Sequence, residues 1–304
     1  MPGKRSNLLL WLVLGGGTFL FLCLLLMSLI IYYSQSRESS FSSFSLASNQ
    51  IAILEVEGLI ADSTDFVDQL KEYGERPSVK AVILRLNTPG GGVAASQEMF
   101  EAVKRFRSET GKKVVVSMAS VAASGGYYLA CGADRIFANP GTVTGSIGVI
   151  AEWYNYGELL KWAKTSDIVI KSGTFKDAGS GTRPLTEEER VYMQNLVDNM
   201  YGQFVSAVAG GRKMNEAVVR KLADGRVYTG QEAKANGLVD DIGTFQDAVE
   251  ATAKMAGISG KPRLLKPPKA AISLLDMLLG NSKSALSLIP DRSQSNIRFQ
   301  YLWR

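Results

Sequence analysis

The sequence predicts an α/β protein built around a parallel sheet, with a membrane-spanning helix ahead of it. Short apolar segments rich in Val and Ile alternate with amphipathic segments of helical length, which is the pattern of βαβ units. An uncharged apolar run near the N-terminus is long enough to cross a bilayer. The 304 residues suffice for one large domain or two small ones, and no internal repeat is evident.

The first half of the globular part is expected to alternate strands and helices. Apolar residues alternate through Ile51–Gly58, as in a half-buried strand. Phe66, Leu70 and Tyr73 recur at helical spacing and would share one helix face. The expected strands are Ile51–Gly58, Val79–Leu86 and Lys113–Met118, and the expected helices are Asp62–Gly74 and Ala94–Arg107.

The second half continues with shorter strands and one long helix. Thr186 and Glu189 have the spacing of a capping box, which predicts the start of that helix. A further helix begins near Tyr228, ends at Gly237 and leads into a strand. The other expected elements are strands at Arg135–Ala138 and Asp167–Lys171 and helices at Thr186–Ala209, Asn215–Ala223 and Phe245–Met255.

The apolar run Leu8–Tyr33 carries no charge and follows Lys4 and Arg5. It exceeds the roughly 20 residues that a span needs, and no small-x-small cleavage site closes it directly. We expect a single-pass anchor with its basic start in the cytoplasm, so that the rest of the chain lies outside. A cleaved signal peptide is the alternative. The serine-rich residues 34–49 are expected to form a linker.

The composition excludes several kinds of site. The chain has no histidine, which rules out a Ser-His-Asp triad, a Cys-His dyad and a histidine-ligated metal. Its two cysteines, Cys23 and Cys131, cannot form a disulfide framework. The net charge of +5 comes largely from the two ends of the chain and from scattered lysines. No arginine-rich block with interleaved aromatics occurs, so nucleic-acid binding has little support. A hydrolase of this composition must use lysine or a carboxylate as its base.

The stretch Val114–Cys131 is the centre of the predicted site. It begins as a buried strand and meets Ser124 and two glycines before a helical pattern, so that the serine would stand at a helix N-terminus. A capping serine is the simpler reading of this stretch alone. A nucleophile there would have an oxyanion hole from the N–H of Gly125 and that of Gly91 or Gly92, with each donor contributing about 3–4 kcal/mol.

Lys176 is the candidate base. It lies in a polar, glycine-bearing loop, Ser172–Gly179, that does not look like an exposed helix face. A lysine accepts a proton at ambient pH only if desolvation lowers its pKa. A solvated surface lysine is the alternative. Lys171 competes for the role, although its place at the end of a predicted strand favours a structural part.

These residues together resemble a known family, the short bacterial signal peptide peptidases of serine peptidase family S49. The resemblance extends over roughly Ile51–Ala256, and its motifs occur in consistent order: Asn87–Gly92, Ala123–Tyr128, Thr144–Val149, Lys171–Asp177 and Gly237–Gly243. It implies a ClpP/crotonase fold and a Ser-Lys dyad. By this resemblance Ser124 is the nucleophile, Lys176 is the base and Ser146 orients the lysine.

The resemblance also implies a mechanism and partners. Lys176 would take the Ser124 proton during attack on a peptide carbonyl and later protonate the leaving amine, without a metal or other cofactor. Family members of this length form ring- or dome-like homo-oligomers, whose dyad can be completed between neighbours. The implied substrates are remnant signal peptides and unfolded segments, met outside the cytoplasmic membrane of a bacterial cell.

The same resemblance divides the chain and leaves alternatives. The divisions are a basic start at 1–7, a membrane helix at 8–33, a linker at 34–49, the peptidase domain at 50–260 and a tail at 261–304. An NfeD-like Ser-Lys membrane protease is one alternative, although such proteins usually have further spans. A crotonase-type acyl-CoA enzyme is disfavoured outside the cytoplasm, and an inactive peptide-binding scaffold is the non-enzyme alternative. The tail could pack on a neighbouring subunit, contact the membrane or occupy the peptide groove.

Overall fold

The computed structural model describes residues 24–28, 49–266 and 298–303. The chain divides into two compact units, Met1–Ser48 and Asn49–Arg304. All the strands described below lie in the second unit. That unit therefore holds the fold and the candidate site.

The predicted membrane anchor falls almost entirely outside the described residues. Residues 24–28, within the predicted span, are helical. In the part of the chain that the structure describes, no helix is both long and apolar enough to cross a bilayer. The leucine-rich stretch Ala270–Leu279 of the predicted tail also lies outside the described residues.

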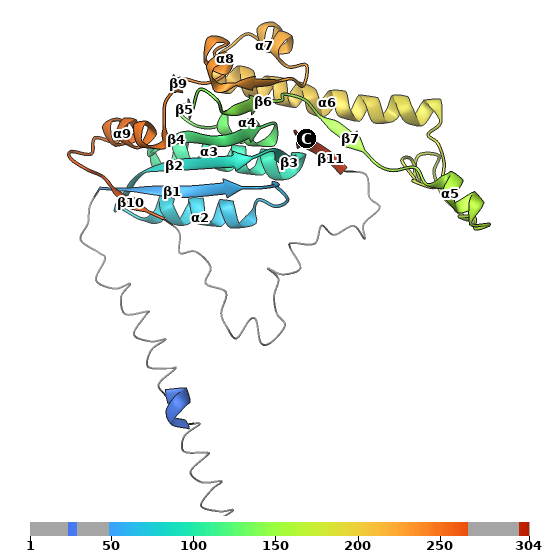
Figure 1. Ribbon diagram of the computed structural model, residues 1–304, viewed down its shortest axis with the longest axis horizontal. Helices are drawn as coiled ribbons and strands as arrows, with labels where there is room; N and C mark the ends of the chain where they lie inside the picture. The colour runs from blue at the N-terminus through green and yellow to red at the C-terminus, as the bar shows by residue number, and fades with distance from the viewer. Residues whose placement is uncertain (1–23, 29–48, 267–297, 304) are drawn as a thin grey trace, which may run out of the picture. The chain divides into compact units, whose positions relative to one another are not determined.

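A largely parallel sheet forms the centre of the second unit (Figure 1). Its strands run in the order β10-β1-β2-β4-β5-β9, and every neighbouring pair along this order is parallel. The far end of β4 also pairs with β6, which in turn pairs antiparallel with β8. The strands are β1 (Gln50–Glu57), β2 (Val79–Thr88), β4 (Lys113–Ala123), β5 (Arg135–Ala138), β6 (Val143–Gly145), β8 (Val227–Thr229), β9 (Asp241–Ile242) and β10 (Arg263–Leu265). The predicted mixed α/β fold with a parallel sheet is confirmed.

Both faces of this sheet are apolar. Successive side chains of a strand point to opposite sides, and the central strands have apolar residues at consecutive positions. Ile51, Ile83 and Val115 pack in a smaller core with one helix, α9. Their neighbours Val82 and Leu84 belong to the larger core, which the other main helices cover. The helices are α2 (Thr64–Glu75), α3 (Val93–Thr110), α4 (Gly125–Ala130), α6 (Glu187–Arg212), α7 (Glu216–Leu222), α8 (Gly230–Ala235) and α9 (Phe245–Met255). Each helix predicted for the globular part of the chain is present, within a few residues of its expected bounds.

A second, smaller sheet lies beside the predicted site. Its strands are β3 (Gly90–Gly92), β11 (Arg298–Leu302) and β7 (Ile150–Glu152), with β11 in the middle and antiparallel to both neighbours. The sequence predicts a turn where β3 lies and does not fix the position of β11. This sheet joins three segments that are far apart in the sequence.

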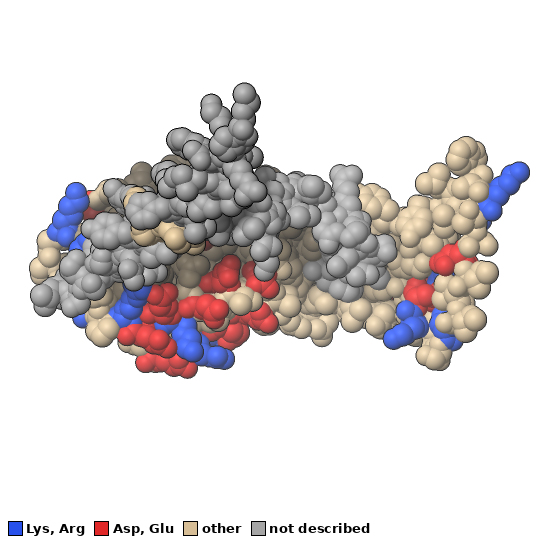
Figure 2. All heavy atoms as spheres, turned by 90° about the horizontal axis from the view of Figure 1, so that it is seen from below, with Lys and Arg blue, Asp and Glu red and all other residues tan. Residues whose placement is uncertain are grey.

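The predicted strand Asp167–Lys171 is wrong. Its residues have irregular backbone within the arm, which we define as residues 153–186, between β7 and α6 and including α5 (Gly157–Trp162). Ile168 and Ile170 are 84% and 97% exposed, so the alternating pattern has no neighbouring strand or core to pair with. Figure 1 shows the arm extending beyond β7. In Figure 2 charged side chains gather at the other end of the unit, below β1.

Candidate active site

Ser124 stands at a sharp turn where β4 ends and α4 begins. Its φ is +52° and its ψ is −114°, which is a strained backbone for a residue with a side chain. Its N–H donates to the carbonyl oxygen of Gly145 at 2.8 Å, which ties the turn to β6. A methyl group on Gly125 would overlap the hydroxyl of Ser96, and one on Gly126 would lie 2.6 Å from Thr88. The two glycines after the serine are therefore required by close packing.

The Ser124 hydroxyl is buried and makes no hydrogen bond to the described residues. The residue is 1% exposed, and its Oγ has no hydrogen-bond partner within the described part of the chain. A buried hydroxyl without a partner costs about 1–3 kcal/mol, so it does not serve stability. Cys131 at the other end of α4 is also buried, and burial raises the pKa of its thiol to about 12. Ser124 is thus the candidate nucleophile in this turn and Cys131 is a packing residue.

The glycine strand β3 lies against Ser124. Ile60 bridges it on one side, where the Ile60 carbonyl accepts the N–H of Gly92 at 2.8 Å and the Ile60 N–H donates to Gly90 at 2.9 Å. Gly91 has its N–H on the opposite side, because neighbouring residues of a strand point their amides in opposite directions. Of the two oxyanion donors considered from the sequence, Gly92 is already in use, and Gly91 faces the site.

β11 lies on that opposite side of β3. Tyr301 pairs with Gly91, and the N–H of Trp303 donates to the carbonyl of Pro89 at 2.9 Å, two positions further along. Hydrogen-bonded pairs recur every second residue in an antiparallel ladder, so Tyr301 and Gly91 form such a pair. A methyl group on Gly90 would overlap the Tyr301 carbonyl oxygen and lie 2.6 Å from the N of Gly125. The Tyr301 carbonyl therefore lies beside the predicted oxyanion hole.

Ser146 is brought next to Ser124 by strand register. Ala123 of β4 pairs with Gly145 of β6, so the two serines follow paired residues. Ser146 also has a positive φ, +49°, and is 6% exposed, with its N–H donating to the carbonyl of Arg226 at 2.9 Å. Ser124 and Ser146 therefore have the same kind of strained backbone, each at the end of one of two neighbouring strands.

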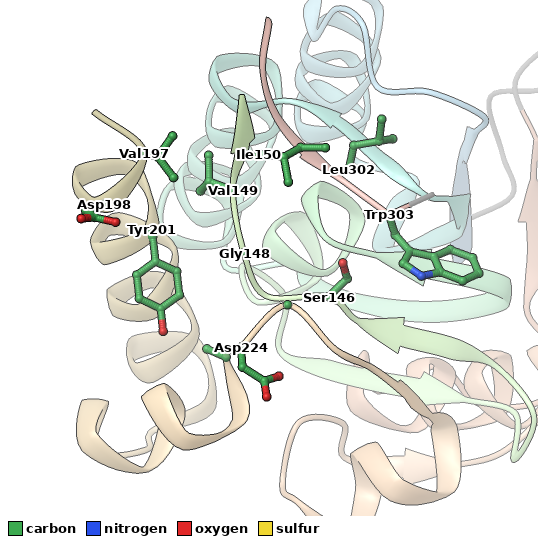
Figure 3. Close-up of a pocket in the computed structure, with 12 residues that line it drawn as sticks. Ser146, Gly148, Val149, Ile150, Val197, Asp198, Tyr201, Asp224, Leu302 and Trp303 are labelled. Atoms are coloured by element: carbon green, nitrogen blue, oxygen red, sulfur yellow. The ribbon is translucent and has the colours of Figure 1, made fainter. Parts of the chain in front are cut away.

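A cavity of about 510 Å³ opens beside Ser146. Its walls come from the segment around β7, from α6, from the loop before β8 and from the end of β11. Figure 3 shows Ser146 and Trp303 on one side of this space and Tyr201 of α6 on the other, with Asp224 below. The cavity is large enough to admit a side chain as far as Ser146, whereas Ser124 does not line it.

Lys176 is not brought to Ser124 in this chain. It is an exposed residue of the arm, and among the described residues its side chain has no hydrogen bond or ion pair. Lys171 donates to the carboxylate of Asp177 at 2.5 Å and to the carbonyl of Thr174 at 2.9 Å. The competing lysine is therefore engaged in holding the loop, and Lys176 is the one left free.

An ionic network ties the Lys176 loop to the start of α6. Arg183 contacts the carboxylates of both Asp177 and Glu189. Glu189 is 2% exposed and also accepts the N–H of Thr186, completing the predicted capping box. The bonds from Arg183 lower the pKa of Glu189 to about 2, while those from Lys171 and Arg183 lower the pKa of Asp177. The carboxyl next to Lys176 is thus neutralised by other cations.

Sequence reasoning missed two parts of this site. The first is β11, for which the strand pattern is too short to identify and the partners are too distant. The second is the pairing of Arg183 with Glu189, although the capping-box spacing had marked Glu189 as a helix start. Among the described residues no group of three or more His, Cys, Asp or Glu could hold a metal ion.

Comparison with known proteins identifies the class of this chain as a serine peptidase. The sequence profile of peptidase family S49 matches residues 106–259. A Synechocystis protein named as a protease is 44% identical over 69% of this chain and 75% of its own length. An Enterococcus faecium protein named as a signal peptide peptidase is 40% identical over 68% of this chain and 64% of its own. The chain belongs to peptidase family S49.

Other relatives differ in length. Protease 4 of Salmonella typhi is 34% identical over 81% of this chain, but the match spans only 41% of that protein. A point mutant of the 1510-N membrane-bound stomatin-specific protease is a solved structure with a TM-score of 0.47. It is 16% identical over 74% of this chain and 100% of that one, a likeness that supports no statement about function.

Proposed function

We propose that this protein is a membrane-anchored serine endopeptidase that uses Ser124 and Lys176 as a dyad. The position of β11 is the observation that carries the proposal. An extended segment is paired on both sides, and its Tyr301 carbonyl lies beside the amide of Gly125 and the strand of Gly91. A peptide substrate laid in the same way would present its carbonyl to the idle Ser124 hydroxyl.

The proposed reaction is acyl transfer. The neutral amine of Lys176 accepts the Ser124 proton while Oγ bonds to the carbonyl carbon, and the amides of Gly91 and Gly125 stabilise the oxyanion. The protonated lysine then gives its proton to the departing amine, and water releases the acyl group from Ser124. Ser146, next to the nucleophile, would hold the lysine by a hydrogen bond.

Lys176 must reach the cavity beside Ser146 for this reaction. The arm of the same chain would have to move, or the arm of a second copy would have to enter. The apolar side chains of the arm support the second route, because Trp162, Ile168 and Ile170 are between 82% and 97% exposed in one chain. Large exposed apolar surfaces of this kind usually contact another protein. A homo-oligomer, of the ring or dome type expected from the sequence, would cover them.

The resemblance and the name of one relative support the proposed substrates, and the resemblance and the apolar N-terminal run support the proposed location. The Enterococcus faecium relative is named as a signal peptide peptidase. We propose remnant signal peptides and unfolded extracytoplasmic segments as the substrates of this chain. A ClpP/crotonase-type domain, held at the outer side of the bacterial cytoplasmic membrane, would cleave them. The apolar run Leu8–Tyr33 supports the anchor.

The test uses the full chain in detergent with an unstructured fluorogenic peptide. Ser124→Ala and Lys176→Ala are each expected to abolish cleavage, and a fluorophosphonate is expected to label Ser124. Mixing the two inactive variants distinguishes the source of the lysine: recovery of activity requires a shared dyad, and no recovery requires a dyad within one chain. Full activity of Ser124→Ala refutes the mechanism.

A peptide-binding scaffold without activity is the second candidate, favoured by the separation of Lys176 from the site in a single chain. It predicts that the wild-type chain binds peptides without cleaving them and that Ser124 resists the fluorophosphonate.

A further inference from the structure

Phe175, the residue before Lys176, is stacked on a ring of α6. Its partner is Tyr192, with ring centroids 5.0 Å apart and planes at 28°. Phe175 is 44% exposed and Tyr192 is 40% exposed, so the stack lies at the surface and belongs to neither core. Stacking of this kind fixes the orientation of two rings relative to each other. The backbone at Phe175 is thereby held against the helix.

Asp177, the residue after Lys176, is attached to the same helix by ion pairs. One oxygen of its carboxylate accepts a hydrogen bond from Nε of Arg183 at 3.2 Å, and Arg183 also contacts the buried Glu189 of α6. The other oxygen lies 2.5 Å from the ammonium of Lys171, at the far end of the same loop. The loop is therefore closed on itself and attached to α6 by a single carboxylate.

The two attachment points on α6 are neighbours. Glu189 and Tyr192 are three residues apart, which places them on one face of the helix and about 4.5 Å apart along its axis. The attached loop residues lie directly before and after Lys176, whose own side chain is exposed. Lys176 is thus held between two fixed points. We call the five residues that hold it the clamp: Phe175, Asp177, Arg183, Glu189 and Tyr192.

The backbone of the loop consists of turns and bends. The N–H of Lys176 donates to the carbonyl of Gly173 at 3.1 Å, and similar turn bonds follow from Ala178 and Ser180, at 3.1 and 3.0 Å. Bonds of this kind in an exposed loop open more easily than those of a packed helix or sheet. The direction in which Lys176 projects therefore depends on the side-chain contacts of the clamp.

We infer that Phe175 and Asp177 are positioning residues, which fix the direction of the Lys176 side chain by attaching its backbone to α6. This inference rests on the proposed dyad, in which the lysine amine must come within hydrogen-bond reach of the Ser124 hydroxyl. A displacement of about 1 Å at a reacting group lowers a rate by roughly 100-fold. If the clamp only folds the arm, its loss changes stability and leaves turnover as it was.

The first experiment measures kcat and KM of full-length variants in detergent with the unstructured fluorogenic peptide. Asp177→Asn and Phe175→Leu should each lower kcat roughly 10- to 100-fold and leave KM within about twofold. Tyr192→Leu should behave like Phe175→Leu, whereas Tyr192→Phe keeps the stacked ring and should retain the wild-type kcat. Glu187→Gln, at an exposed ion pair in the first turn of α6, is the matched control and should also retain it. Wild-type kcat in both clamp variants, or a change in KM alone, overturns the inference.

The second experiment measures backbone hydrogen exchange, so that failure of the clamp can be told from failure of the peptidase. The turn amides of the loop should exchange roughly tenfold faster in Asp177→Asn and Phe175→Leu than in the wild type. They should keep the wild-type rate in Glu187→Gln and in Lys176→Ala, because neither side chain belongs to the clamp. This exchange pattern in a wild type that cleaves nothing would refute the proposed function alone. Unchanged exchange in both clamp variants of an active enzyme would refute the clamp alone.

Discussion

Replacing Gly90 by alanine should block the proposed oxyanion site while leaving the rest of the fold in place. The added methyl would overlap the position of the Tyr301 carbonyl oxygen and lie 2.6 Å from the N of Gly125. A carbonyl could then no longer approach that amide. Loss of one oxyanion donor typically lowers kcat by roughly 100- to 1000-fold, and we expect a fall of this order. The left-handed φ of +100° adds a backbone strain of about 1–2 kcal/mol.

Gly111→Ala is the matched control for that strain. Gly111 ends α3 with a φ of +68°, and a methyl there meets nothing within 4 Å. Both variants should lose stability, by about 2–4 °C in Tm for each kcal/mol, but only Gly90→Ala should lose turnover. Peptide hydrolysis and thermal unfolding of both proteins make the comparison. A Gly90→Ala enzyme within twofold of wild-type kcat would show that this carbonyl position is not the reacting one.

Three further outcomes are expected. Tyr301→Ala in the full chain should raise kcat/KM for added peptides, because β11 loses its buried ring and competes less; an unchanged rate would mean that β11 does not limit access. Arg183→Met should lower the free energy of unfolding by about 3–5 kcal/mol, because it leaves the buried Glu189 without its ion-pair partner. Arg190→Met, at an exposed ion pair, should change the free energy of unfolding by less than about 1 kcal/mol. Chemical unfolding measures both variants. The pKa of the Glu189 carboxyl is lowered from 4.5 to about 2, so this group contributes stability that is present above pH 4.5 and is lost as the pH falls towards 2. In that range the free energy of unfolding should fall more steeply with pH for the wild type than for Glu189→Gln.

Local signals predicted most of the main sheet and the turn at Ser124. The strand before Ser124 and the helix after it can be read from neighbouring residues, and the glycines between them are demanded by contacts within that turn. The proximity of Ser146 depends on the pairing of β4 with β6, which no spacing in the sequence reveals. Only the resemblance to a family pointed to that residue.

The parts that could not be predicted depend on distant partners. β3 and β7 are three residues each, and β11 joins them from the other end of the chain, so their hydrogen bonds arise only when the fold brings them together. The error at Asp167–Lys171 has the reverse cause: its alternating residues have strand propensity but meet no partner strand in the described part of the chain. The sequence identifies Lys176 as a candidate base because it is a lysine in a polar, glycine-bearing loop. It does not predict that Lys176 is separated from Ser124 within one chain.

The placement of β11 between β3 and β7 also restricts what can bind in its place. A segment in that position pairs through both of its backbone edges, so both must be free at the same time. A strand within a folded sheet offers at most one free edge, and a helix has already paired its amides with its own carbonyls. Only a chain that has lost, or never acquired, its secondary structure can comply. Discrimination between folded and unfolded proteins would then require no dedicated recognition domain, since the geometry of three short strands already imposes it.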